Sequence, residues 1–150
     1  MDTAICSFVN QLLGKRLESL TCACEMLNFE FSEGLALHAF GLTRIIQGDD
    51  ILLTTADYQF WDEADAAHND EWFNAQRFRE QIVGGTVLSA EMNPLHDLRI
   101  RMDNGITVEC LITNATPHYG EEQDQWMLFE ATGDGGGRFL IVRNRTIEFP

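Results

Sequence analysis

The sequence predicts an α+β domain, a curved and mostly antiparallel sheet of about seven strands covered on one face by two helices. Three observations lead to this prediction. Several segments alternate apolar with polar residues, glycine-containing turns separate them, and two segments have the three-to-four-residue apolar spacing of a helix. The 150 residues, 45% of them hydrophobic, suit a single domain that covers residues 1–150.

The first helix is expected at the start of the chain, where apolar residues fall on one helical face: Ile5, Phe8, Val9 and Leu12. Asp2 or Thr3 can cap its beginning, and Gly14 stands where a glycine often ends a helix. A second helix is predicted over residues 71–83, before Gly84-Gly85. Each helix is therefore followed by a glycine turn.

Two hairpins are predicted from strict alternation. The first joins residues 27–31 to 35–39, and the second joins 98–102 to 106–110 through Asn104-Gly105. An Asn-Gly pair favours a type I′ turn, with positive φ at both central residues. Further extended segments are expected at 51–53, 58–61, 126–131, 139–142 and 147–149.

The two hairpins superpose when 71 is added to each residue number. The matched pairs are Gly14 with Gly85, Leu17 with Leu88, Leu27 with Leu98, Phe29 with Ile100, Phe31 with Met102, Gly34 with Gly105, Leu35 with Ile106, and Leu37 with Val108. Because a helix precedes each hairpin, the pattern indicates an internal duplication with units 4–61 and 70–150 that share one core. Convergence of two ordinary hairpins is the alternative.

Charge is the most unusual property of the chain. Ten basic residues stand against 24 acidic ones, which gives a formal net charge of -14. Direct binding to nucleic acid or to an anionic membrane is disfavoured, because phosphate contacts need clustered Lys and Arg. No apolar run reaches the roughly 20 residues that span a bilayer, and the first residues lack the basic start of a secretion signal. We therefore expect a cytoplasmic protein that is either highly soluble or attracted to a cationic partner.

No catalytic, cofactor or metal motif is recognisable. The cysteines (Cys6, Cys22, Cys24 and Cys110) and the histidines (His38, His68, His96 and His118) lack the spacing of a metal site. Cys110 alternates in phase with Ile106 and Val108, so its thiol is predicted to be buried. The glycines at 133–137 lead into a strand pattern instead of a helix, unlike a phosphate loop. We expect a binding protein without enzymatic activity, bound metal or cofactor.

Acidic residues concentrate in one segment. Between Ile45 and Gln76 there are eight of them and no Lys or Arg, interleaved with aromatic residues. This pattern predicts a docking surface in which aromatic side chains are buried and carboxylates steer a cationic partner. The predicted partner-binding residues are Asp49, Asp50, Asp57, Trp61, Asp62, Glu63, Asp65, Asp70, Glu71 and Trp72. A solvated loop whose aromatic residues anchor it to the core is the alternative, and the acidic cluster at 121–124 is a second candidate.

The chain resembles the small acidic immunity proteins of bacterial contact-dependent growth inhibition and polymorphic toxin systems. The resemblance lies in size, in acidity, in the strand, Asn-Gly turn and strand over 97–109, and in the segment Gln125-Trp126-Met127-Leu128. It implies a monomer that binds and neutralises one cognate basic toxin domain, commonly a cationic nuclease acting on RNA, tRNA or DNA, by masking its active site. It transfers no individual residue, because these families share no functional motif.

Two other functions fit the same sequence. A nucleic-acid mimic would share the electrostatics but would block several DNA-binding proteins. A small-ligand or enzymatic α+β domain would instead use a pocket inside the curved sheet.

Overall fold

The computed structural model describes residues 2–59, 63 and 69–150, which form two α-helices and eleven strands together with short 3-10 helices. In chain order the elements are α1 (Thr3–Val9), η1 (Asn10–Leu12), β1 (Leu17–Ala23), β2 (Met26–Phe31), η2 (Ser32–Gly34), β3 (Leu35–Ala39), β4 (Leu42–Gln47), β5 (Asp50–Thr54), η3 (Thr55–Tyr58), α2 (Asp70–Ile82), β6 (Val87–Met92), β7 (Leu98–Met102), β8 (Ile106–Leu111), β9 (Asp124–Glu130), β10 (Phe139–Arg143) and β11 (Ile147–Glu148).

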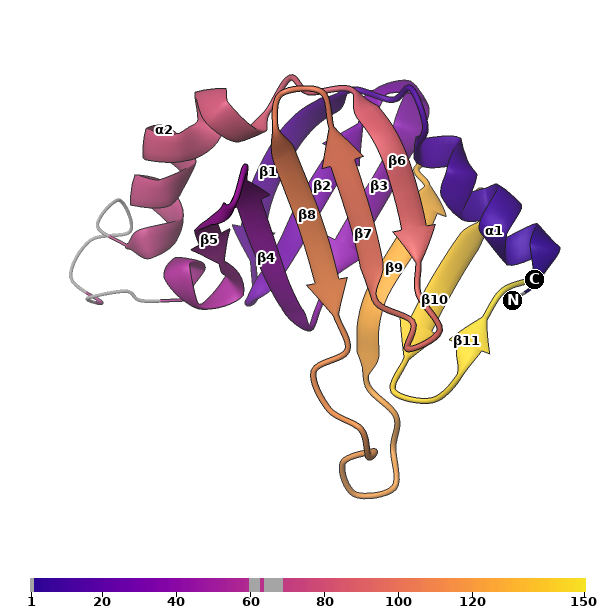
Figure 1. Ribbon diagram of the computed structural model, residues 1–150. Coiled ribbons are helices and arrows are strands. Elements are labelled where there is room, and N and C mark those ends of the chain that lie inside the picture. Colours follow the sequence, from indigo (N-terminus) through magenta and orange to yellow (C-terminus); the bar gives the residue numbers. More distant parts are fainter. Residues whose placement is uncertain (1, 60–62, 64–68) are drawn as a thin grey trace.

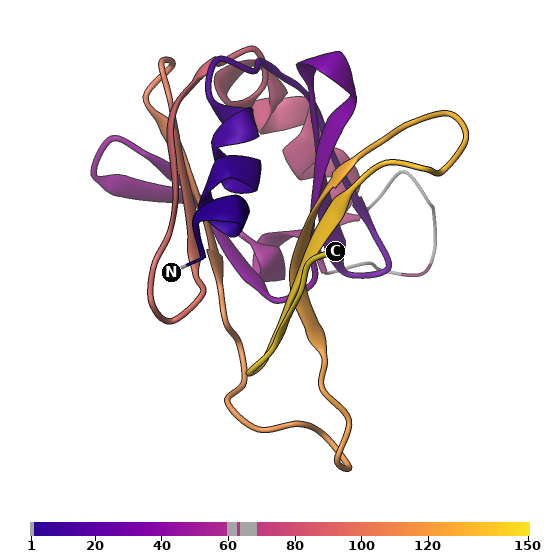
Figure 2. The same cartoon turned by 90° about the vertical axis from the view of Figure 1, so that its right-hand side faces the viewer.

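The strands form two antiparallel sheets that face each other across one hydrophobic core (Figure 2). The six-stranded sheet has the order β1-β2-β3-β9-β10-β11, and the five-stranded sheet has the order β5-β4-β8-β7-β6. Helix α1 lies at one side of the sandwich and α2 at the other (Figure 1). The predicted α+β class with two helices and antiparallel strands is confirmed. The strands are more numerous than the expected seven, because segments without strict alternation of apolar and polar residues in the sequence, such as β4, also pair. They are divided between two sheets.

The two helices form where the sequence predicts them. The carboxylate of Asp2 accepts a hydrogen bond from the backbone N–H of Ala4 at 2.8 Å, which caps α1. The four residues of the predicted apolar face are buried: Ile5, Phe8, Val9 and Leu12. Asn104 closes the far end of α2, since its amide donates to the carbonyls of Gln81 and Ile82 at 3.2 and 3.1 Å.

The two halves of the chain exchange strands. Strands β1, β2 and β3 of the first half are completed by β9 and β10 of the second, while β6, β7 and β8 are completed by β4 and β5. The ladders have equivalent registers, since Leu37 lies opposite Leu128 and Val108 lies opposite Ile45. Each half therefore supplies strands to both sheets.

A reciprocal set of backbone hydrogen bonds joins the halves around a bridge between Arg16 and Thr86. Gly14 N–H donates to the Val87 carbonyl at 3.0 Å, and Gly84 N–H donates to the Leu17 carbonyl at 2.8 Å. Two further bonds run from Leu17 N to Gly85 O at 2.9 Å and from Val87 N to Lys15 O at 2.8 Å. The members of each pair are related by a shift of 70 residues.

This shift corrects part of the predicted alignment. The shift of 71 holds for the β2–β3 and β7–β8 ladders, in which Leu27 and Leu98 occupy equivalent positions. It fails for β1 and β6, because five residues separate the paired Met92 and Leu98, whereas four separate the equivalent pair Cys22 and Leu27. Buried Leu17 therefore corresponds to buried Val87, whereas Leu88 is 61% exposed.

Two local predictions are wrong. Tyr58 was expected in an extended segment over 58–61, but it is buried in η3, which turns the chain after β5; residues 60 and 61 lie outside the described residues. At the second hairpin, Gly105 has a φ of 82° while Asn104 does not have a positive φ. A type I′ turn needs positive φ at both central residues and is therefore absent. The side-chain amide of Asn104 caps α2 instead.

None of the helices in the described residues is long and apolar enough to cross a membrane.

Replacing Gly105 with Val should lower the free energy of unfolding by about 1–3 kcal/mol, since a β-branched residue is strained at positive φ. An added Cβ meets no atom within 4 Å there, so the loss would come from the backbone alone. Gly133→Val is the matched control, because Gly133 is equally uncrowded and lacks a positive φ. Chemical denaturation of both variants measures the difference, and equal stabilities would contradict the turn geometry.

Candidate functional site

The structure divides the acidic segment between the two ends of strand β5. Asp49 and Asp50 are exposed in the β4–β5 turn, which is tied to the second hairpin by a 3.2 Å bond from Gly48 N to Gly105 O. Asp57 lies beyond the other end of β5, which is about 17 Å long at 3.4 Å per residue. These carboxylates therefore do not form one compact cluster.

The structure describes only some of the remaining predicted partner-binding residues. Glu63 is exposed with a φ of 62°, and Asp70 is the half-buried first residue of α2. Glu71 and Trp72 lie in the first turn of α2, and their side chains are outside the description. Trp61, Asp62 and Asp65 lie outside the described residues.

Asp57 has a structural role that the sequence analysis did not assign. Its Oδ2 accepts hydrogen bonds from Thr54 N at 2.8 Å and from Thr54 Oγ1 at 3.3 Å. These contacts are half of a capping box that starts η3. The Asp57 carbonyl also accepts a hydrogen bond from the side-chain amide of Asn74 in α2. Asp57 thus holds η3 between β5 and α2.

A hollow of about 560 Å³ opens beside η3, where the chain passes between the two sheets. We call this site the hollow. Its lining combines exposed apolar side chains, amides and hydroxyls with two carboxylates: Glu25, Phe40, Gly41, Leu42, Thr55, Ala56, Gln59, Thr113, Asn114, Gln123, Asp124 and Gln125. No Lys, Arg or His is among these described lining residues. The hollow therefore offers apolar contact and negative charge together.

Buried Gln125 fixes the walls of the hollow. Its Oε1 accepts from Thr113 N at 2.7 Å, and its Nε2 donates to Asn114 Oδ1 at 2.9 Å. Its carbonyl accepts from the N–H groups of Phe40 and Gly41 at 2.9 and 3.0 Å. A side chain at position 41 would come within 2.9 Å of Gln125 Oε1, so only glycine allows this close approach. The hollow is therefore preformed.

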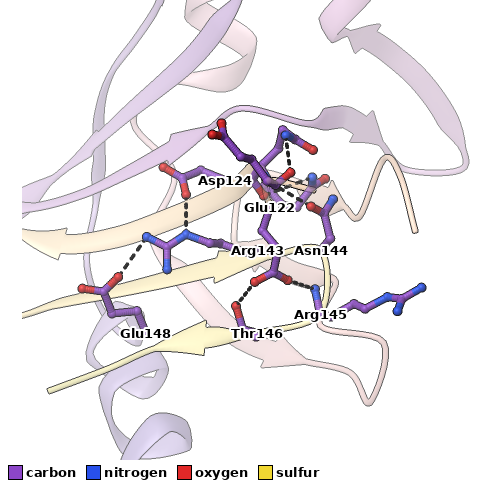
Figure 3. Close-up of polar contacts among 10 residues, drawn as sticks. Glu122, Asp124, Arg143, Asn144, Arg145, Thr146 and Glu148 are labelled. Carbon is purple, nitrogen blue, oxygen red and sulfur yellow. Dashed lines mark hydrogen bonds and ion pairs between the residues drawn. The ribbon is translucent and has the colours of Figure 1, made fainter. Parts of the chain in front are cut away.

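Two of the three carboxylates in the second acidic cluster are committed to internal contacts (Figure 3). Glu122 accepts from Thr146 Oγ1 at 2.5 Å and from Arg145 N at 2.8 Å, and these hydrogen bonds lower the pKa of its carboxyl group. Asp124 pairs with Arg143 at 2.9 Å. Glu121 is exposed, and its carboxylate has no hydrogen bond or ion pair within the described residues.

Two of the arginines that form no ion pair within the described residues lie away from the hollow. Arg99 and Arg101 alternate with the buried residues of β7, so they lie on the outer face of the five-stranded sheet. Neither forms an ion pair within the described part of the chain. Neither lines the hollow. The hollow and this outer face therefore differ in charge, because the described lining of the hollow has no basic side chain.

The described residues include no group of three or more His, Cys, Asp or Glu side chains that could hold a metal. Cys110 is buried as predicted, and burial raises the pKa of its thiol to about 12. A thiol with this pKa is a poor nucleophile near neutral pH. Comparisons with protein-family models, with curated proteins and with solved structures gave no match.

Sequence reasoning missed Phe40, Leu42 and Gln125. Phe40 directly follows β3 and Leu42 begins β4, and both are more than a third exposed although they are large apolar residues. Their one visible signal is the pair Phe40-Gly41, which interrupts the alternation of the preceding strand. Gln125 is a polar residue directly before Trp126, and only the crossing of the two connections makes it buried.

The thiols should differ in reactivity in the folded protein. At pH 8, Cys24, which is exposed, should react rapidly with a disulfide reagent, whereas Cys110 should react only after unfolding. No disulfide joins any of the four cysteines, all of which belong to the described residues, so the denatured protein should release four equivalents. Rapid modification of Cys110 in the native protein, located by mass spectrometry, would contradict its burial.

Proposed function

We propose that this chain is an immunity-type inhibitor that binds and neutralises one cognate basic toxin domain, with a cationic nuclease as the favoured class. The observation that carries this proposal is the hollow, in which exposed Phe40 and Leu42 lie beside the exposed carboxylate of Glu25, while Asp124 is paired with Arg143. The resemblance in size and acidity to immunity proteins supports the same function.

The lining suits a basic side chain of a partner. An Arg or Lys can lay its aliphatic part on apolar surface while its charged end reaches a carboxylate. In the hollow, Phe40 and Leu42 supply the apolar surface, and Glu25 supplies an exposed carboxylate. A partner rich in arginine would therefore be bound by several of its groups at once.

Electrostatics favours a nuclease among basic partners. An enzyme that binds phosphate groups needs Lys and Arg around its cleft. The same cationic cleft is attracted by a chain of net charge -14. Exposed Asp49, Asp50 and Glu63 add to this attraction from outside the hollow. Masking the cleft would inhibit the enzyme without any reaction at the inhibitor.

The first test is the gene neighbourhood: we expect the open reading frame of this chain to follow directly a gene for a large secreted toxin, whose toxin domain is then co-expressed with this chain. We expect the chain to restore growth and to co-purify with that domain in a 1:1 complex. Growth arrest in the presence of the folded chain, or the absence of any complex, would overturn the proposed function.

A charge-reversal pair then tests the hollow. Glu25→Lys and Glu18→Lys change the net charge equally, but Glu18 lies at the opposite end of β1 from Glu25. We expect Glu25→Lys to slow association with the toxin domain at least about fivefold more than Glu18→Lys does, because a charge in the interface steers the encounter. Glu25→Lys should also weaken the dependence of the association rate on salt concentration. Stopped-flow mixing at two salt concentrations measures both rates.

Equal association rates for the two variants would place the interface away from the hollow. Phe40→Ala adds an independent measurement, because Phe40 is 38% exposed and its removal should leave the core intact. It should raise the dissociation rate with little change in the association rate.

A further inference from the structure

The two halves of the chain differ most in the connection between β8 and β9. Residues 112–123, here called the projecting loop, extend away from both sheets (Figures 1 and 2). The equivalent connection in the first half, between β3 and β4, contains only Phe40 and Gly41. Since two residues suffice to pass from one sheet to the other, the fold does not require a loop of this length.

The base of the projecting loop is nevertheless fixed. The buried side chain of Asn144 accepts from Gln123 N at 2.8 Å and donates to the Asn114 carbonyl at 2.9 Å, so it links both legs of the loop. Arg145 donates to the Ala115 carbonyl at 3.0 Å. Figure 3 shows Asn144 and Arg145 beside Glu122, which belongs to the loop. These contacts hold the loop in one direction before any partner binds.

The tip of the loop is a two-residue turn with an unusual residue in it. His118 and Glu121 exchange backbone hydrogen bonds at 3.0 and 2.9 Å, and between them Tyr119 and Gly120 have φ of 53° and 79°. Positive φ at both central residues is the type I′ geometry, for which Asn, Asp and Gly are favoured. An aromatic residue at positive φ is uncommon and adds strain.

Tyr119 does not compensate for this strain by packing. Its side chain is fully exposed, the most exposed large apolar side chain in the described residues. Neither its conformation nor its surroundings therefore contribute to folding. A strained, exposed aromatic residue at the end of an anchored loop is the arrangement expected of a binding residue, since a rigid Tyr gives a large contact area at low entropic cost.

We propose that Tyr119 enters the cationic cleft of the partner toxin and that the projecting loop is the element that blocks the active site. This inference rests on the proposed function. The loop contains no Lys or Arg, and the exposed carboxylate of Glu121 stands next to the turn. An arginine of the cleft can stack on the Tyr119 ring and pair with Glu121. Because Thr113, Asn114 and Gln123 also line the hollow, loop and hollow form one continuous surface.

The test uses Tyr119→Asn in the full chain, with the toxin domain identified by the co-expression test as the probe. Asn suits the left-handed turn, so the unfolding midpoint should stay the same or rise. The Kd for the toxin domain should rise at least about 30-fold, the change that corresponds to a hot spot of about 2 kcal/mol. Leu88→Thr is the matched control: it alters another exposed apolar residue, at the beginning of β6, and should leave the Kd unchanged.

Site-specific cross-linking shows where Tyr119 contacts the toxin domain, and this result does not depend on the stability of the variant. A photoreactive benzoylphenylalanine in place of Tyr119 should cross-link to residues of the toxin's catalytic cleft. If the wild-type chain binds the toxin but Tyr119→Asn binds equally well, or the cross-link lies outside the cleft, the inference is overturned while the proposed function stands. If the wild-type chain does not bind the toxin, both are overturned.

Discussion

The ladder between β3 and β9 and its counterpart between β8 and β4 tie each half of the chain to the other. In the first, Leu37 pairs with Leu128, and in the second, Val108 pairs with Ile45; all four side chains are buried. A separated half would leave both ladders open and one face of its apolar strands exposed to water. Neither half can therefore bury its own core alone, and the domain is expected to fold as one cooperative unit. Each helix also packs on a strand of the other half: α1 of the first half packs on β6, and α2 of the second half packs on β1.

The exchange of strands also creates the candidate site. Each half must pass once from one sheet to the other, and the two connections meet where Gln125 accepts hydrogen bonds from Phe40 and Gly41. The backbones approach each other so closely at this crossing that position 41 has no room for a side chain. The hollow opens beside the crossing. The same crossing is where the second half carries its long insertion. The repeated architecture thus has its longest additional connection next to the hollow, and such a connection is free to serve binding because the core does not depend on it.

Acidic residues in this protein have two separate tasks. Some stabilise the fold: Asp57 caps η3, Glu122 and Asp124 hold the base of the projecting loop, and Glu33 pairs with Lys15. Others, such as Asp49, Asp50 and Glu121, are exposed. Composition counts both kinds equally, whereas only the exposed ones are free to attract a partner. Arg99 and Arg101 of β7, which form no ion pair within the described residues, face outward on the five-stranded sheet, where Arg99 lies between Glu91 and Glu109 of the neighbouring strands.

Much of the local structure was determined by the sequence itself. The apolar spacing of residues 5–12, the alternation of the β2–β3 and β7–β8 hairpins and the buried position of Cys110 follow from short-range periodicity, which a side chain's neighbours along the chain fix. The tertiary structure alone decided that the strands divide into two sheets and exchange partners, that β1 and β6 align with a shift of 70, and that Asn104 caps α2. It also brought Phe40, Glu25 and Gln125 to one hollow and exposed Tyr119 at the tip of the loop whose base lines that hollow. These features depend on contacts between residues far apart in the chain, and a hydrophobic pattern carries no information about which distant strand will satisfy its hydrogen bonds.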